Sequence, residues 1–221
     1  CRDYAEFEEM AKAELNLVIS PVVLAAAKKM EKKLRIPWLR HLRSYRLDEI
    51  DEMYAALSKQ LNTDLTEAAA EFRKKAEEKI RETLAVIDDY PVAVDYQAVL
   101  RPFNLALALT EYGFKVGLVA SNGIPAFEKE SAKKLKEMVP DVVFTDPMHP
   151  QSVQYPHEGE EYLCIGFDCG YITKSKKLVE LVEDEGLFGY SGVMELMNRM
   201  QDAFLTKADV NKMIEGAGLI I

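Results

Sequence analysis

Arg101 and Pro102 stand between two apolar segments, PVAVDYQ and a run of helix-forming residues that leads to KVGLVA. The order predicts a strand, a turn that carries the arginine, a helix and a second strand. Open α/β sheets bind ligands at the carboxyl ends of their strands, where this turn lies. An arginine beside a helix N-terminus adds to the positive end of the helix dipole and attracts anions. The alternative is an ordinary surface arginine, and the position after a strand favours function.

Two cysteines flank the end of a predicted strand at residues 162–167. Thiolates bind iron, but Cys164 and Cys169 lack a third and a fourth cysteine nearby, so they make no closed cluster site. Cys164 stands next to Ile165 in a strand that is expected to be buried, so we predict that Cys164 is a core residue. Cys169 is expected in a loop beside Asp168 and is the better candidate for a metal ligand. Another candidate metal site lies in the loop 146–160, which contains Asp146, His149 and His157.

Several function classes are disfavoured. The sequence has neither a G-x-x-x-x-G-K-[ST] loop nor a G-x-G-x-x-G turn after a strand, which argues against a nucleotide-dependent enzyme. The glycines at 186, 189 and 192 have the wrong spacing and predict a tight turn before a closely packed helix. A net charge of −9 argues against nucleic-acid binding, and no apolar run is long enough for a membrane segment. Three cysteines and a Lys/Glu-rich surface suggest a reducing cytoplasm.

The pattern of apolar residues predicts an α/β protein with Rossmann-like, three-layer domains, parallel sheets, and two domains joined by a long helix. Residues 1–63 read as a partial Rossmann-like domain, with strands in LNLVIS and IPWLRHL and helices after Ser20 and over Leu47–Leu61. Asp64–Asp89 is a long helix with a capping box, and residues 64–90 form the connection. Residues 91–221 form the other domain. Its elements are expected as strands at 92–97, 115–120, 142–145 and 162–167 and helices at 101–112, 125–138, 174–184 and 190–205.

The sequence begins without Met and inside a helix-like phrase, CRDYAEFEEMAKAEL. This beginning suggests a fragment of a longer polypeptide. Function therefore has to be inferred for part of a larger protein.

Three phrases, in order, resemble the nitrogenase component 1 type oxidoreductases. LNLVISPVVLAAAKKMEKKLRIPWLRHL resembles that family's second domain, and its end, Arg35-Ile36-Pro37-Trp38, is similar to the family's G-I-P-W. DYQAVLRPFNLALALTEYGFKVGLV resembles the start of the third domain, with the L-R-P turn at Leu100-Arg101-Pro102. GLFGYSGVMELMNRM resembles the closing G-x-x-G-[FY]-x-G helix. The likeness covers nearly the whole chain, so residues 1–63 match the C-terminal part of the second domain and 91–221 the third.

The resemblance implies an α or β subunit of a nitrogenase-like reductase, paired as a homodimer or a heterodimer. Its electrons would come from a separate ATP-dependent iron–sulfur reductase, and its pocket would hold an iron–sulfur or related metallocluster, or a tetrapyrrole. The electron-relay cysteines belong to an N-terminal domain outside these residues. The alternative is that these 221 residues hold no cofactor at all.

The sequence departs from the family at its cofactor ligands. Where the family has a cysteine after N-L-V-x, this chain has Ser20. The family's histidine is expected near residues 162–167, where only Cys164, Ile165 and Asp168 stand. Arg101 keeps the arginine that faces the cofactor in nitrogenase. These departures argue against dinitrogen as the substrate.

The resulting hypothesis is an oxidoreductase subunit that reduces an unknown substrate. Arg101 would anchor an anionic cluster or a substrate carboxylate, Tyr96 and Gln97 would line the mouth of the site, and Asp168 or Cys169 would face it. Two alternatives stay open. One is a non-catalytic metallocluster scaffold or carrier, and the other is a small-molecule binding protein.

Overall fold

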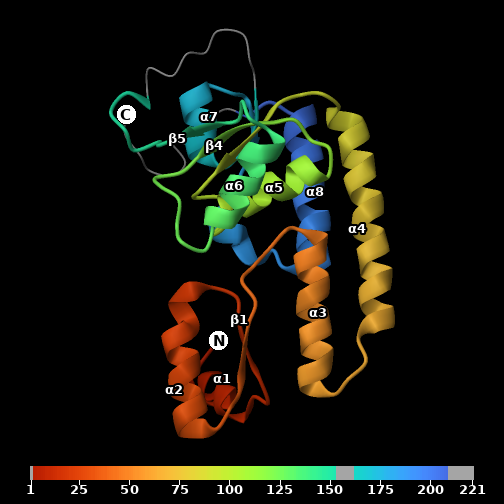
Figure 1. Ribbon diagram of the computed structural model, residues 1–221, viewed down its shortest axis with the longest axis vertical. Helices are drawn as coiled ribbons and strands as arrows, with labels where there is room; N and C mark the ends of the chain where they lie inside the picture. Colours follow the sequence, from red (N-terminus) through yellow and green to blue (C-terminus); the bar gives the residue numbers. More distant parts are fainter. Residues whose placement is uncertain (1, 153–161, 209–221) are drawn as a thin grey trace. The chain divides into compact units, whose positions relative to one another are not determined.

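The computed structural model describes residues 2–152 and 162–208 and divides the chain into two compact units. The first unit contains residues 1–43 and 48–70, and the second contains 44–47 and 71–221 (Figure 1). The domain limits expected at residues 63 and 90 stay a prediction. In the described part of the chain, we find no helix with the length and apolar character needed to cross a membrane.

The first unit contains a β-α-β arrangement. Strand β1 (Asn16–Val18) pairs in parallel with β2 (Trp38–Arg40), and the connection contains the 3₁₀ helix η2 (Pro21–Val23) and α2 (Leu24–Leu34). Ser20 precedes η2 in an extended conformation, as expected for a residue before proline. The unit also contains α1 (Tyr4–Glu9), η1 (Met10–Lys12) and most of α3 (Leu47–Leu61).

The long helix is α4 (Thr66–Ile87). The carboxylate of Asp64 accepts a hydrogen bond from the Thr66 N–H at 2.9 Å, which caps the helix start. Alanine is frequent in its sequence, and one face is buried through Ala76, Ile80, Thr83 and Ile87. The helix predicted over 64–89 is therefore confirmed to within two residues at each end.

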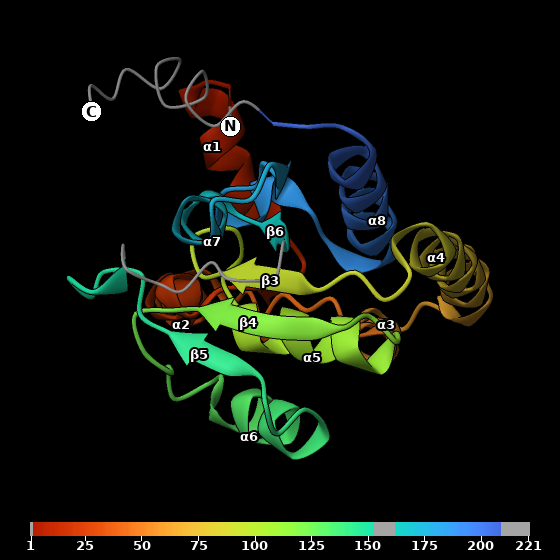
Figure 2. The same cartoon turned by 90° about the horizontal axis from the view of Figure 1, so that it is seen from above.

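The second unit is a five-stranded parallel sheet with helices on both faces (Figure 2). Its strands are β3 (Val92–Asp95), β4 (Val116–Ala120), β5 (Val143–Thr145), β6 (Leu163–Ile165) and β7 (Lys177–Val179), in the order β5-β4-β3-β6-β7. Helices α5 (Pro102–Glu111) and α6 (Lys129–Met138) cover one face, and α7 (Phe167–Thr173) and α8 (Gly189–Leu205) cover the other. The predicted α/β class with parallel sheets is confirmed.

The strand order determines where a ligand site is expected. The chain passes from β3 to β4 and β5 on one side, then returns to β6 and β7 on the other side of β3. In chain order this is 3-2-1-4-5, the Rossmann order without its sixth strand, and its direction reverses between β3 and β6. In open α/β sheets, ligands bind outside the carboxyl ends of the strands at such a reversal, so the segments that follow β3 and β6 are the place to look for a site.

One part of the secondary-structure prediction was wrong. The helix expected at 174–184 is replaced by β7 and the 3₁₀ helix η4 (Glu183–Gly186), and the end of the expected strand 162–167 belongs to α7. The apolar residues of KKLVELV fit a strand as well as a helix. Leu178 and Val179 are buried by pairing with β6, and left-handed backbone at Asp184 and Glu185 prevents a continuous α-helix.

Candidate functional site

The candidate site begins with Asp95, the last residue of β3 and a fully buried carboxyl. Its Oδ1 accepts the Gln97 N–H at 2.8 Å, and its Oδ2 accepts the Cys169 N–H at 2.9 Å. Because Gln97 follows β3 and Cys169 lies in α7 after β6, one side chain fixes both loops at the reversal point. The sequence analysis did not single out Asp95, although an aspartate that ends an apolar strand was a usable signal.

Gly166 explains how the two loops come this close. It precedes α7 with φ = 106°, in a region open mainly to glycine, and a Cβ added there would lie 2.4 Å from the Cβ of Asp95. Any larger residue would push the turn after β6 away from β3. A glycine is therefore required for the Asp95 hydrogen bond to α7.

Three residues predicted for the site are brought together by the structure. The Gln97 side-chain amide donates to the Asp168 carboxylate at 2.9 Å and lies 3.2 Å from the Tyr96 hydroxyl. Tyr96 and Asp168 are half-buried, and Gln97 is exposed. We call these three residues the polar cluster. It places a phenol, an amide and a carboxyl at the carboxyl ends of β3 and β6.

Burial changes the acidity of both carboxyls in this region. It raises the pKa of Asp95 to about 6, with a smaller upward contribution from the charge of Asp168 and opposing contributions from backbone N–H groups. Burial also raises the pKa of Asp168. Carboxyls that titrate closer to neutral pH hold and release protons under physiological conditions, and such groups concentrate at functional sites.

Arg101 lies where the sequence predicts it, immediately before α5, but it is paired with the chain's own carboxylate. Its Nε is 3.2 Å from the Oε1 of Glu128, and Glu128 is fully buried. The Glu128 Oε2 accepts the N–H groups of Phe103 and Asn104 at 2.8 and 3.2 Å. The anchoring role expected for Arg101 stays a prediction, and any external anion competes with Glu128 for it. Glu128 gave no signal in the sequence, since FEKE resembles an ordinary helix start.

A third buried carboxyl, that of Asp184, lies after β7 and binds the backbone just before Arg101. It accepts the Leu100 N–H at 3.1 Å and the Tyr45 hydroxyl at 2.9 Å. The backbone of Glu183, Asp184 and Glu185 is left-handed, with φ of 47°, 64° and 44°. Such conformations cost about 1–2 kcal/mol per residue and persist where surrounding bonds impose them. Asp95, Glu128 and Asp184 thus fix residues 95–104 to the loops after β6, β4 and β7.

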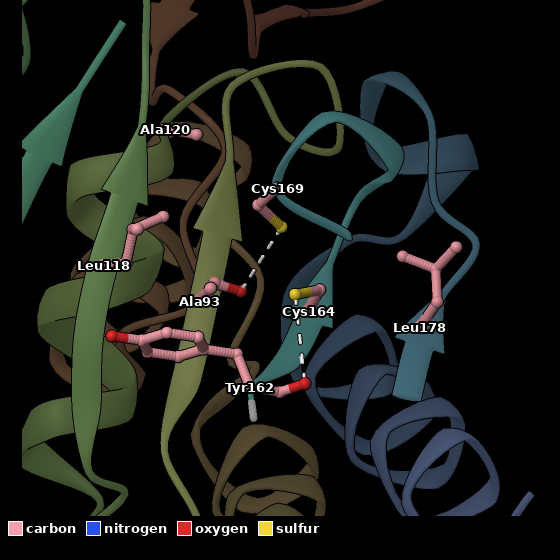
Figure 3. Packing of buried hydrophobic residues seen from close by; sticks show 7 residues of the cluster. All are labelled: Ala93, Leu118, Ala120, Tyr162, Cys164, Cys169 and Leu178. Atoms are coloured by element: carbon pink, nitrogen blue, oxygen red, sulfur yellow. Dashed lines mark hydrogen bonds between the residues drawn. The ribbon is translucent and has the colours of Figure 1, made fainter. Parts of the chain in front are cut away.

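Figure 3 shows the two cysteines inside the core of the sheet. Cys169 lies in the first turn of α7 and is fully buried, so the prediction of a loop position was wrong; its N–H is drawn into the helix start by Asp95. Its Sγ lies 3.3 Å from the Gly166 carbonyl oxygen, and burial raises the pKa of its thiol. Cys164 is buried as predicted, with its Sγ 3.3 Å from the Thr173 hydroxyl.

These donors do not fit a metallocluster bound within this part of the chain. A cluster requires thiolates or imidazoles at its surface, whereas both thiols here are buried and contact neighbouring polar groups of the chain. Ser20, which the family resemblance places at the position of a cysteine, is half-buried in the first unit and has a hydroxyl side chain. Over residues 2–152 and 162–208, no three His, Cys, Asp or Glu side chains are grouped to hold a metal ion. His149 accepts the Gln151 N–H, and His157 lies outside the described residues.

Comparison with known proteins gives one family. The family described as nitrogenase component 1 type oxidoreductase matches residues 1–205. A solved structure titled "Nitrogenase Cp1 at pH 6.5" is similar to the chain with a TM-score of 0.63 and 15% sequence identity. The similarity covers 96% of this chain and 49% of that one, so the chain spans about half the length of the solved protein. A search of curated protein sequences finds no significant match.

Proposed function

Because the chain belongs to the nitrogenase component 1 type oxidoreductase family, we propose that it is part of a subunit that reduces a substrate with electrons from a separate ATP-dependent iron–sulfur protein. The observation that carries the proposal is the polar cluster at the reversal point of a parallel sheet. Two such subunits, identical or related, would form the complete enzyme. The lack of a phosphate-binding loop in these 221 residues agrees with ATP hydrolysis by the partner.

In this proposal the substrate lies against Tyr96, Gln97 and Asp168. Reduction of an organic substrate consumes protons as well as electrons, and general acids within hydrogen-bond reach supply them. Asp168 faces the substrate with a raised pKa, and Asp95 lies behind it, also with a raised pKa. Gln97 holds the Asp168 carboxyl in place and contacts the Tyr96 hydroxyl.

The possible metal ligands in the described part of the chain limit where a metal could be bound. Since the buried thiols of Cys164 and Cys169 do not fit a cluster, we propose that any iron–sulfur group of the complete protein is bound by residues outside the part of this chain that the structure describes. Ser20 in place of a cysteine disfavours a nitrogenase-type cofactor. We therefore propose a substrate other than dinitrogen.

Iron and acid-labile sulfide content tests the proposal. The natural polypeptide that contains these residues is purified without oxygen and analysed beside the 221-residue chain. About four iron atoms per natural polypeptide, as in one [4Fe–4S] cluster, and none in the 221-residue chain support a reductase whose cluster lies elsewhere. Iron in neither protein refutes the redox function.

A second function, a non-catalytic metallocluster scaffold or carrier, is favoured by the substitution at Ser20, because a carrier has no need of a permanently ligated cofactor. Transfer of iron to an acceptor protein distinguishes it, since a carrier loses its iron to the acceptor and a reductase keeps it. A protein without iron that binds an organic ligand would instead be a small-molecule binding protein.

A further inference from the structure

We propose that Glu128 is a specificity-determining residue, which excludes anionic ligands from the corner formed by Arg101 and the start of α5. The inference relies on the proposed function only for the location of the ligand, at the carboxyl ends of the central strands. It assigns that ligand to the uncharged or cationic class.

Without Glu128, the corner would present a set of hydrogen-bond donors. Helix α5 begins with Pro102, which has no N–H, so the first N–H groups at the helix start belong to Phe103 and Asn104. Together with the Arg101 guanidinium, they form a set of donors suited to a phosphate or a carboxylate. The sequence predicts an anion at this place for that reason.

The Glu128 carboxylate contacts all of these donor groups. One oxygen of Glu128 accepts both N–H groups, at 2.8 and 3.2 Å, and the other lies 3.2 Å from the Arg101 Nε. The Arg101 side chain is 11% exposed and that of Glu128 is fully buried. The burial of Glu128 raises its pKa, while the charge of Arg101 and the two N–H groups lower it. The corner is thus filled by one carboxylate with both of its oxygens engaged.

Glu128 is held by its backbone as well as by its side chain. Its N–H donates to the Pro125 carbonyl at 2.9 Å, and its carbonyl accepts the Ala132 N–H at 2.9 Å, as expected for the N-cap residue of α6. An external anion would have to break three polar contacts and move a buried charge. Breaking a buried pair leaves an uncompensated charge in the protein interior, which opposes binding of the anion.

The side chains that remain for a ligand carry no positive charge. The polar cluster offers an aspartate carboxyl, a tyrosine hydroxyl and a glutamine amide. Asp168 repels a second carboxylate or a phosphate at this position. With the positive charge of Arg101 balanced by Glu128, this edge of the sheet favours ligands that donate hydrogen bonds.

Phosphate binding by the 221-residue chain tests the inference without any electron transfer, so it stands or fails separately from the proposed function. Thermal unfolding is followed in increasing phosphate, with chloride at equal ionic strength as the reference. We expect no phosphate-specific shift for the wild type. Glu128→Ala should gain a rise in Tm of about 4 °C at ten times its measured Kd, because the donors become available.

Three further variants define the outcomes. R101A/E128A should lose the phosphate response, because the guanidinium is gone. Glu130→Ala removes an exposed acid two residues away and should behave like the wild type. Glu128→Ser also removes the carboxylate, keeps a residue type that is favoured at a helix N-cap, and replaces Glu128→Ala if that variant does not fold. A phosphate response in the wild type that Arg101→Ala abolishes would overturn the inference, and so would its absence in both Glu128 variants.

Discussion

Asp95 provides a quantitative test of the electrostatics of the site. Its pKa is raised from an ordinary value of 3.8 to about 6, chiefly by burial. An acid with a raised pKa in the folded state binds its proton more tightly there than in the unfolded chain. The folded protein therefore gains stability as the pH falls from above 6 towards 4, and the effect ends below the unfolded pKa. Between about pH 7 and about pH 4.5, this single group should add about 2 kcal/mol to the free energy of unfolding.

The assay is urea unfolding at a series of pH values for the wild type, Asp95→Asn and, as a control, Asp141→Asn, which changes an exposed carboxyl. Because asparagine does not titrate, the difference in unfolding free energy between the wild type and Asp95→Asn should shift by about 2 kcal/mol in favour of the wild type over that pH range. Asp141→Asn should follow the wild-type profile. Parallel profiles for the wild type and Asp95→Asn would refute the reasoning. If Asp95→Asn does not fold, the midpoint of the Asp95 carboxyl resonance in wild-type NMR spectra gives the same answer.

Two further changes test the contacts that fix residues 95–104. Gly166→Ala should destabilise the fold by about 3 kcal/mol or more in urea unfolding, since its Cβ would overlap the end of β3 and its backbone has positive φ. Gly123→Ala, which also has positive φ but meets no atom of the described residues within 4 Å, should cost clearly less; equal losses would contradict the steric argument. Tyr45→Phe should cost about 1–3 kcal/mol, because the buried Asp184 carboxyl loses its hydroxyl donor. Tyr171→Phe changes an exposed ring and serves as its control, and a neutral Tyr45→Phe would count against a structural role for that bond.

The main features of the fold could be predicted from local patterns. The helix over Leu47–Leu61 was predicted with the observed bounds, because its apolar residues recur at helical spacing and its flanks are polar. Strand β4 is apolar throughout and β3 is apolar as far as Asp95, as expected when helices cover both faces of a sheet. The prediction of a helix over 174–184 was wrong because its apolar pattern fits a strand as well as a helix. Only the pairing of β7 with β6 decides between the two.

The site was predictable in part. Tyr96, Gln97 and Asp168 were placed at one edge because the carboxyl ends of parallel strands share that edge, and the structure joins them by hydrogen bonds. The contact between Arg101 and Glu128 was not predictable, because it depends on how the loop before α6 folds over α5. The same holds for Asp184, whose partners are distant in the sequence.

We have proposed that the chain is part of a reductase supplied with electrons by an ATP-dependent iron–sulfur protein. The most direct test of this proposal is the oxidation of the reduced iron–sulfur protein, measured by stopped-flow absorbance with the natural polypeptide and its substrate present. We expect rapid oxidation that requires both ATP and the polypeptide. An oxidation rate that is unchanged when either one is omitted would contradict it.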